Sequence, residues 1–115
     1  MRSCVIIPAR YQSSRLPGKP LITLLGKPMI IWVAELASKA VGVSNVFIAT
    51  DDIRIANTVN EKGYKHIMTS SSCLTGTDRV AEASIGLDYD VFINVQGDEP
   101  LVCPEDILRC IDYKI

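Results

Sequence analysis

Cationic and hydroxyl side chains are concentrated in residues 8–20, directly after a short apolar run. They are Arg10, Ser13, Ser14, Arg15 and Lys19. Guanidinium, ammonium and hydroxyl groups are the donors that bind a triphosphate. The segment is not a Walker A loop, because Gly18-Lys19 is followed by Pro20, and it contains no GxGxxG dinucleotide motif. Composition alone leaves two readings open, a triphosphate site and a solvated basic loop.

A second segment, residues 75–79, combines a glycine with a hydroxyl and a cation. Gly76 lets the backbone approach a ligand closely, and Thr77 is suited to cap a following helix. The free N–H groups at a helix start favour anions or carbonyl oxygens, and Arg79 could donate to the edge of a base. The alternative is an ordinary capped helix whose Arg79 is solvated.

The third segment, residues 94–100, carries carboxylates directly after an apolar run. Asp98 follows a glycine at the predicted end of a strand, where it is placed like a metal ligand. Magnesium commonly binds through one or two carboxylates and the phosphates of a substrate. Gln96 offers both a donor and an acceptor to a base or sugar. The alternative is a turn with solvated carboxylates.

Apolar β-rich runs alternate with amphipathic helical patterns along the chain. Strands are predicted at 4–7, 46–49, 66–68 and 91–95, and helices at 29–41, 53–62, 77–85 and from Pro104 onward. This alternation predicts a mainly parallel sheet with helices on both faces, a three-layer α/β fold. Ligands of such sheets bind at the carboxyl ends of the strands. All three polar segments are expected at that edge.

The helical periodicities also predict which side chains face the sheet. They are Met29, Trp32, Val33, Leu36, Ala37 and Ala40 in the first helix, Ile55, Ala56 and Val59 in the second, and Val80, Ala81, Ser84 and Ile85 in the third. Asp51 or Asp52 is expected to cap the second helix. Cys4 is expected in the core, and His66 at a surface or strand edge.

Length and composition indicate one domain, residues 1–115, with a single core. The net charge of −1 argues against general nucleic-acid binding, and no apolar run is long enough to span a membrane. The four cysteines form no CxxC pair, which indicates reduced thiols. The start lacks the apolar region of a signal peptide, so a cytoplasmic location is expected.

Several of these segments, taken together, resemble one enzyme family. They are Ile7-Pro8-Ala9-Arg10, Ser14-Arg15-Leu16-Pro17-Gly18-Lys19-Pro20-Leu21, Gly26-Lys27-Pro28-Met29-Ile30, Ala49-Thr50-Asp51-Asp52, Thr75-Gly76-Thr77-Asp78-Arg79 and Asn94-Val95-Gln96-Gly97-Asp98-Glu99-Pro100. In this order they look like the 3-deoxy-manno-octulosonate (Kdo) cytidylyltransferases, or CMP-Kdo synthetases. The first loop is shared with related sugar nucleotidyltransferases, and the last run is specific to the Kdo branch. The resemblance implies a Rossmann-like, nucleotide-diphospho-sugar transferase-like fold.

The resemblance also implies a reaction and residue roles. The 2-hydroxyl of Kdo would attack the α-phosphate of CTP and release pyrophosphate, in the synthesis of a lipopolysaccharide precursor. The implied CTP-binding residues are Ala9, Arg10, Ser14, Lys19, Thr77, Arg79 and Gln96. Among these, Arg10 and Lys19 would act on the phosphates, and Asp98 would bind Mg²⁺ as the metal ligand, so these three are the expected catalytic residues.

Two departures from the family pattern stand out. Ser72 and Cys73 occupy places where the family usually has an acidic residue and a histidine. Family members also continue for about as long again beyond the position of Ile115, and that part normally supplies Kdo contacts, a second metal carboxylate and much of a dimer interface. A homodimer with little transfer activity by itself is therefore expected. Two alternatives stay open: an acylneuraminate-type cytidylyltransferase, and a non-catalytic nucleotide-binding module.

Overall fold

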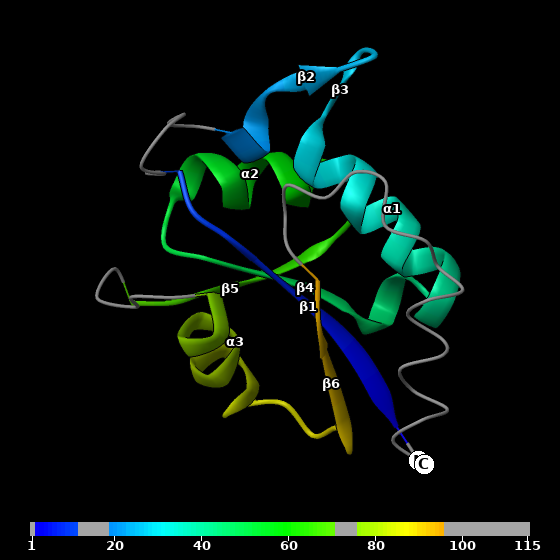
Figure 1. The fold of residues 1–115 in the computed structure, drawn as a ribbon, viewed down its shortest axis with the longest axis vertical. Helices are drawn as coiled ribbons and strands as arrows, with labels where there is room; N and C mark the ends of the chain where they lie inside the picture. Colours follow the sequence, from blue (N-terminus) through cyan, green and yellow to red (C-terminus); the bar gives the residue numbers. More distant parts are fainter. Residues whose placement is uncertain (1, 12–18, 71–75, 96–115) are drawn as a thin grey trace.

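The computed structural model describes residues 2–11, 19–70 and 76–95, and these form a parallel sheet between two layers of helices (Figure 1). The strands are β1 (Ser3–Ala9), β4 (Val46–Thr50), β5 (Lys65–Met68) and β6 (Val91–Asn94). Their order across the described sheet is β5-β4-β1-β6, and every neighbouring pair is parallel. The predicted three-layer fold with a parallel sheet is confirmed.

Strand β1 is longer than predicted, because it continues through Pro8 to Ala9, which lie opposite Ala49 and Thr50 of β4. Proline lacks an N–H and normally ends a central strand. The carbonyl of Ile6 accepts a hydrogen bond from the nitrogen of Val95 at 3.2 Å, on the β6 side. The nitrogen of Pro8, two residues later, faces the same side but lies beyond the described pairing of β6. The N–H that Pro8 lacks therefore costs no hydrogen bond between the described strands.

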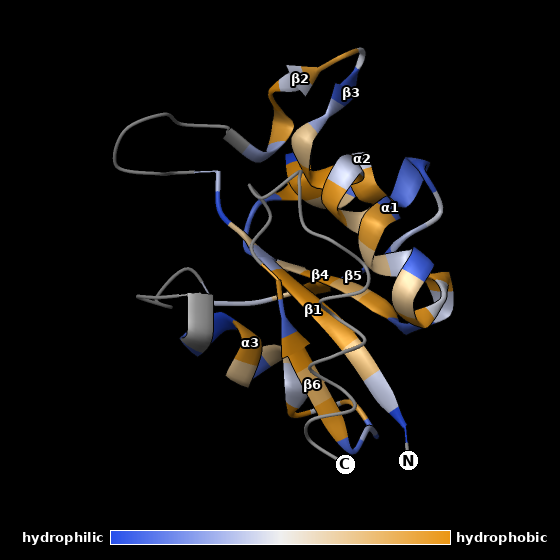
Figure 2. Cartoon of the chain, turned by 45° about the vertical axis from the view of Figure 1, so that its right-hand side comes forward, coloured by the Kyte–Doolittle hydropathy of each residue, from blue (hydrophilic) through white to orange (hydrophobic). Residues whose placement is uncertain are grey.

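Helices α1 (Met29–Val41) and α2 (Ile53–Glu61) cover one face of the sheet, and α3 (Gly76–Ser84) covers the other. Alternate residues of β1 divide between the two cores: Val5 and Ile7 pack with α1 and α2, while Cys4 and Ile6 pack with Ala83 of α3. This division follows from the two-residue period of a strand. The two central strands, β1 and β4, are accordingly apolar along most of their length (Figure 2). The core position predicted for Cys4 is confirmed.

The predicted bounds of α1 are confirmed, but its predicted buried face is confirmed only in part. The fully buried residues are Ile30, Ile31, Val33, Ala34 and Ala37. Of the residues predicted to face the sheet, only Val33 and Ala37 are among them, and the rest, including Met29, are half-buried. Two apolar stripes with the same period run along this helix, and the one that begins at Ile30 faces the sheet.

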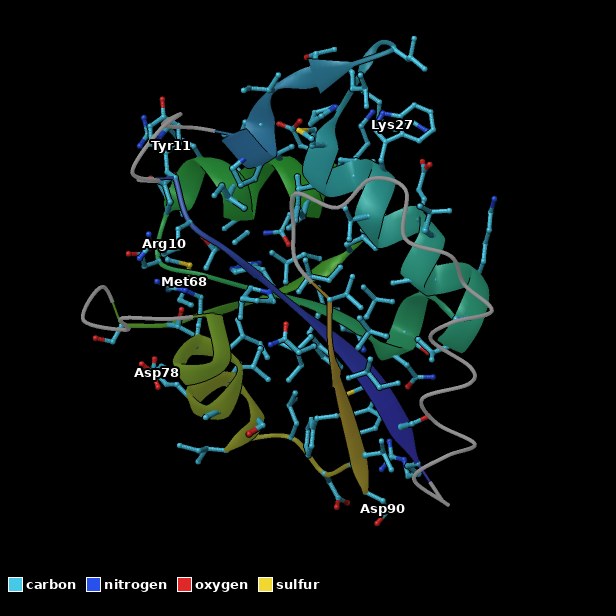
Figure 3. The ribbon with its side chains drawn as sticks, viewed as in Figure 1. Arg10, Tyr11, Lys27, Met68, Asp78 and Asp90 are labelled. Atoms are coloured by element: carbon cyan, nitrogen blue, oxygen red, sulfur yellow. The ribbon has the colours of Figure 1, made fainter. Side chains whose placement is uncertain are left out.

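Trp32 packs on a hairpin instead of entering the core. This hairpin joins β2 (Thr23–Leu24) to β3 (Lys27–Pro28) and turns at Leu25 and Gly26, both of which have positive φ. The indole Nε1 donates to the carbonyl of Leu24 at 2.7 Å, and the ammonium of Lys27 lies 4.3 Å from the ring centre (Figure 3). This hairpin was not predicted from the sequence.

Helix α3 also differs from its prediction. It begins at Gly76, so Thr77 lies in its first turn and not before it. Among the α3 residues whose burial the structure describes, Arg79 and Ala83 are buried, and Val80 is half-buried and packs against the core as predicted. Ala81 is exposed and Ile85 is 84% exposed, so the predicted face is only partly confirmed. In α2, by contrast, burial of Ile55, Ala56 and Val59 is confirmed.

Two 3₁₀ helices complete the described elements, η1 (Lys19–Leu21) and η2 (Val43–Asn45). His66 lies on β5, at an edge of the described sheet, as predicted, and its Nδ1 is 2.9 Å from Oδ1 of Asn60. Among the described residues, no helix combines the length and the apolar character needed to cross a membrane. The helix predicted from Pro104 lies outside the described residues.

Candidate functional site

Three strands end side by side at one edge of the sheet. Ala9 of β1 lies opposite Thr50 of β4, which in turn lies opposite Met68 of β5. The residues that follow these strand ends are therefore neighbours, and they are Arg10, Asp51 and Thr69. Figure 3 shows Arg10 and Met68 on the same side of the molecule as Asp78 in α3. The predicted gathering of polar residues at the carboxyl edge is confirmed for the described part of the chain.

Arg79 is the most unusual side chain at this edge because it is fully buried. Its Nη1 donates to Oγ1 of Thr69 at 2.5 Å and to the carbonyl of Ser70 at 3.4 Å, and lies 3.7 Å from Oδ1 of Asp51. Its Nε and Nη2 are also buried and have no hydrogen-bond partner among the described residues. The reading of Arg79 as a solvated surface cation is therefore excluded, and a buried cation of this kind needs acceptors.

The two adjacent aspartates have separate tasks. Asp52 caps α2, since its Oδ1 accepts from the backbone nitrogen of Arg54 at 2.8 Å. The guanidinium of Arg54 also donates to Asp52, from Nε at 3.0 Å and from Nη2 at 2.7 Å. These hydrogen bonds from Arg54 lower the pKa of Asp52 below its usual value. The predicted cap is confirmed for Asp52, which leaves Asp51 to face Arg79.

The residue after Arg10 is attached to α2. The guanidinium of Arg54 lies 3.2 Å from the centre of the Tyr11 ring. Tyr11 is half-buried and packs against the core beneath α1 and α2, whereas Arg10 itself is exposed. The contact with Arg54 holds the chain just beyond the end of β1, where Arg10 is exposed at the same edge as Arg79. An exposed cation beside an anchored backbone can approach an anionic ligand with little loss of backbone entropy.

The other predicted site residues are only partly described. Ala9 is buried at the end of β1. Lys19 opens η1, which contacts α1 and α2, and the backbone of Thr77 lies in the first turn of α3. The remaining predicted residues, Ser14, Gln96 and Asp98, lie outside the described residues. No group of three metal-binding side chains occurs among the described residues.

Neither Asp51 nor Thr69 was among the site residues predicted from the sequence. Asp51 was expected as a possible cap of the second helix and belongs to one of the segments that resemble the family, but no contact with Arg79 was predicted for either residue. Both directly follow a strand, β4 and β5 respectively. That position was the available signal, since side chains at the carboxyl ends of parallel strands meet at one edge.

Comparison with known proteins agrees with this geometry. A family model described as cytidylyltransferase matches residues 4–114. The chain belongs to the cytidylyltransferase family. A solved structure, of CMP:2-keto-3-deoxy-manno-octonic acid synthetase complexed with CTP, is similar to this cytidylyltransferase chain with a TM-score of 0.94 and 45% sequence identity, over 98% of this chain and 47% of that one. The resemblance drawn from the sequence motifs is confirmed.

Curated relatives of this cytidylyltransferase carry two names. The 3-deoxy-manno-octulosonate cytidylyltransferase of Trichlorobacter lovleyi is 52% identical over 112 residues, which cover 97% of this chain and 44% of the relative. The 8-amino-3,8-dideoxy-manno-octulosonate cytidylyltransferase of Shewanella sp. (strain W3-18-1) is also 52% identical, over 97% of this chain and 47% of the relative. The chain thus spans about half the length of the curated relatives it matches.

Proposed function

We propose that this chain forms the CTP-binding part of a cytidylyltransferase that transfers CMP from CTP to Kdo and releases pyrophosphate. The observation that carries the proposal is the edge of the sheet, where the exposed Arg10 follows β1 and the buried Arg79 of α3 has two donors without a partner among the described residues. An exposed cation suits phosphates, and a buried donor group suits a base that is withdrawn from water. The similarity to a synthetase that binds CTP supports the same reading.

In the proposed reaction, the oxygen of the Kdo 2-hydroxyl attacks the α-phosphorus of CTP and loses its proton to water, while the bond to the pyrophosphate oxygen breaks. Arg10 and Lys19 would stabilise the negative charge of the leaving pyrophosphate, and Ser14 and the backbone of Ala9 would hold the phosphates. Arg79 and Gln96 would place the cytosine and its sugar, next to the first turn of α3 that contains Thr77. No covalent enzyme intermediate is required.

We also propose a divalent cation, Mg²⁺, with the Asp98 carboxylate as its ligand in this chain. The hard oxygen of a carboxylate at the end of a strand is the chemistry that Mg²⁺ prefers. Such an ion, when bound, neutralises charge on the phosphates. Asp98 lies outside the described residues, so its position in the sequence carries this part of the proposal.

Calorimetry with CTP, ATP and MgCl₂ tests the nucleotide assignment. We expect CTP to bind more tightly than ATP, and Lys19→Ala to weaken CTP binding by about ten- to a hundredfold, the effect of a lost charge-assisted contact. Lys39→Ala is the matched control, because Lys39 is an exposed lysine near the end of α1. Equal binding of CTP and ATP, or an unchanged affinity in Lys19→Ala, would contradict the assignment.

The acceptor sugar needs a separate experiment, because relatives of equal identity are named for Kdo and for its 8-amino-8-deoxy analogue. We propose Kdo on the basis of the sequence motif at residues 94–100, which contains Asp98. Pyrophosphate release should be measured with CTP, Mg²⁺ and each sugar in turn. Faster release with the 8-amino sugar would favour that second candidate. If neither sugar leads to pyrophosphate release, the result would favour a chain that binds the nucleotide but does not catalyse the transfer by itself.

We further propose a homodimer in the cytoplasm. Strand β6 has a described neighbour only on its β1 side, and open sheet edges tend to be paired or covered. Cys4 is a free buried thiol, which fits a reducing compartment, where CTP is also available. Light scattering at several concentrations tests the dimer, and a monomer at the highest concentration would contradict it.

A further inference from the structure

We propose that Asp51 and Thr69 are positioning residues that direct the Nε–Nη2 edge of Arg79 toward the base of the bound nucleotide. In this arrangement Arg79 distinguishes cytosine from uracil. The inference rests on the proposed function, because it assumes that the base lies at this edge of the sheet. It adds the two residues that orient the guanidinium and the atoms that make the distinction.

The contacts of Arg79 are all made by one of its nitrogens. Nη1 meets Oγ1 of Thr69 at 2.5 Å, the carbonyl of Ser70 at 3.4 Å and Oδ1 of Asp51 at 3.7 Å. The guanidinium is planar, so fixing Nη1 on one side also fixes the direction of the opposite edge. That edge consists of Nε–H and one N–H of Nη2, which point the same way. Both atoms are buried and unpartnered among the described residues.

Arg54 shows what such an edge does elsewhere in this chain. Its Nε donates to Oδ1 of Asp52 at 3.0 Å, and its Nη2 donates to Oδ2 of the same carboxylate at 2.7 Å. The same pair of nitrogens in Arg79 has no partner in the described part of the chain, although Arg79 is fully buried and Arg54 is exposed. A buried pair of parallel donors therefore calls for two adjacent acceptors.

Cytosine supplies such a pair, because its O2 and N3 are adjacent acceptors. Uracil has a donor, N3–H, in place of the second acceptor, and adenine has an amino donor beside N1. Two parallel donors therefore favour cytosine, because one of them would face a donor group in uracil or adenine. Leaving one buried donor unpaired is what makes such sites selective.

Phosphate oxygens could also accept from this edge, but the charge of Asp51 argues against them. Its carboxylate lies 3.7 Å from Nη1 and offsets much of the positive charge of Arg79. A neutral acceptor such as a base is then favoured over a polyphosphate, which would be repelled by Asp51. Arg10 is exposed and has no acidic partner among the described residues. The segment from Arg10 to Lys19 is therefore better suited to the phosphates.

The two positioning residues are themselves held rigidly. Asp51 directly follows β4, next to the Asp52 cap of α2. Thr69 directly follows β5, and its backbone nitrogen donates to the carbonyl of Thr50 at 2.9 Å. Strand ends of this kind hold a side chain more exactly than a loop does. The orientation of Arg79 is thus set by the sheet and does not depend on a ligand.

The test is the ratio of the dissociation constants for UTP and CTP, measured by calorimetry with MgCl₂. We expect Asp51→Asn and Thr69→Val to weaken CTP binding by about tenfold, while UTP binding changes much less, so that the ratio falls. Thr69→Ser keeps the hydroxyl and should keep the ratio. Asp88→Asn, which removes an exposed carboxylate far from this edge, is the charge-matched control.

One arm of the experiment needs no variant. The triphosphate of 3-deazacytidine has a C–H group in place of N3, so wild-type protein should bind it about tenfold more weakly than CTP. Equal weakening of CTP and UTP by the variants, or equal binding of CTP and its 3-deaza analogue, would overturn the inference and leave the proposed function standing. If wild-type protein does not bind CTP, both are overturned.

Discussion

The guanidinium carbon of Arg54 lies 3.2 Å from the centre of the Tyr11 ring, so the start of helix α2 holds the residue that follows Arg10. The Asp52 carboxylate fixes this guanidinium by accepting two hydrogen bonds from it, and the same residue caps the helix. One acidic residue therefore orders both a helix start and the entry to the basic segment. Arg10 lies between the end of β1 at Ala9 and the anchored Tyr11, so a movement of Tyr11 also moves Arg10.

Replacing Arg54 should therefore weaken nucleotide binding without unfolding the protein. An exposed cation–π contact contributes ~0.5–1 kcal/mol, so Arg54→Ala should raise the Kd for CTP about two- to fivefold. Arg54→Lys keeps the charge over the ring, so its Kd for CTP should lie between those of the wild-type protein and Arg54→Ala. Calorimetry measures the affinities and urea unfolding checks the fold. An unchanged Kd in Arg54→Ala would show that the anchor has no effect on the site.

The Asp52–Arg54 pair also predicts a dependence of stability on pH. Hydrogen bonds from Arg54 lower the pKa of Asp52 in the folded state below its ordinary value of 3.8. The stabilisation is therefore complete above that ordinary value and is lost as the pH falls through the lower, folded pKa. Urea unfolding between pH 2 and 7 should show a loss of stability at the acid end that is smaller in Asp52→Asn. An identical pH profile in that variant would contradict the assignment.

Cys4 should be unreactive in the folded protein. It is fully buried in the core that α3 covers, and burial raises the pKa of its thiol to about 11. At pH 8 only about 0.1% of such a thiol is the reactive thiolate. Alkylation with iodoacetamide, followed by mass spectrometry of the Cys4 peptide, should show labelling only in denaturant. Labelling of Cys4 in native protein at the rate of a free thiol would contradict its burial.

The central sheet predicts a contrast between two isoleucines. Ile48 lies fully buried in β4, between β1 and β5, whereas Ile53 at the start of α2 is 61% exposed. Ile48→Ala should lower the free energy of unfolding by about 2–5 kcal/mol, through lost burial and the cavity left behind. Ile53→Ala is the matched control and should change it by less than about 0.5 kcal/mol. Similar losses in both variants would contradict the packing.

Periodicity predicted which elements form, but it did not decide every buried face. The bounds of α1 were predictable because Pro28 precedes the helix and Gly42, with a φ of 88°, follows it. Its buried face was not predictable, because an apolar stripe from Met29 and another from Ile30 share the same period. Only contact with the sheet separates them, and that contact depends on residues distant in the sequence.

The site shows the same division between local and distant information. The position of Arg10 followed from the strand before it, since polar residues at strand ends gather at one edge. Burial of Arg79 could not be predicted, because a cation enters a core only when acceptors are already in place. Those acceptors come from Asp51 and Thr69, which directly follow the strands β4 and β5. No local pattern around Arg79 contains them.

The central claim is that CTP binds at the carboxyl edge formed by β1, β4 and β5, next to α3. The most direct test is an NMR titration of isotope-labelled protein with CTP and MgCl₂. The account predicts that the amide signals of Arg10, Asp51, Thr69 and Arg79 shift on binding. The signals of Asp88 and Asp90, beside the amino end of β6, should stay in place. Shifts confined to the Asp88–Asp90 end, or no shifts at saturating CTP, would contradict it.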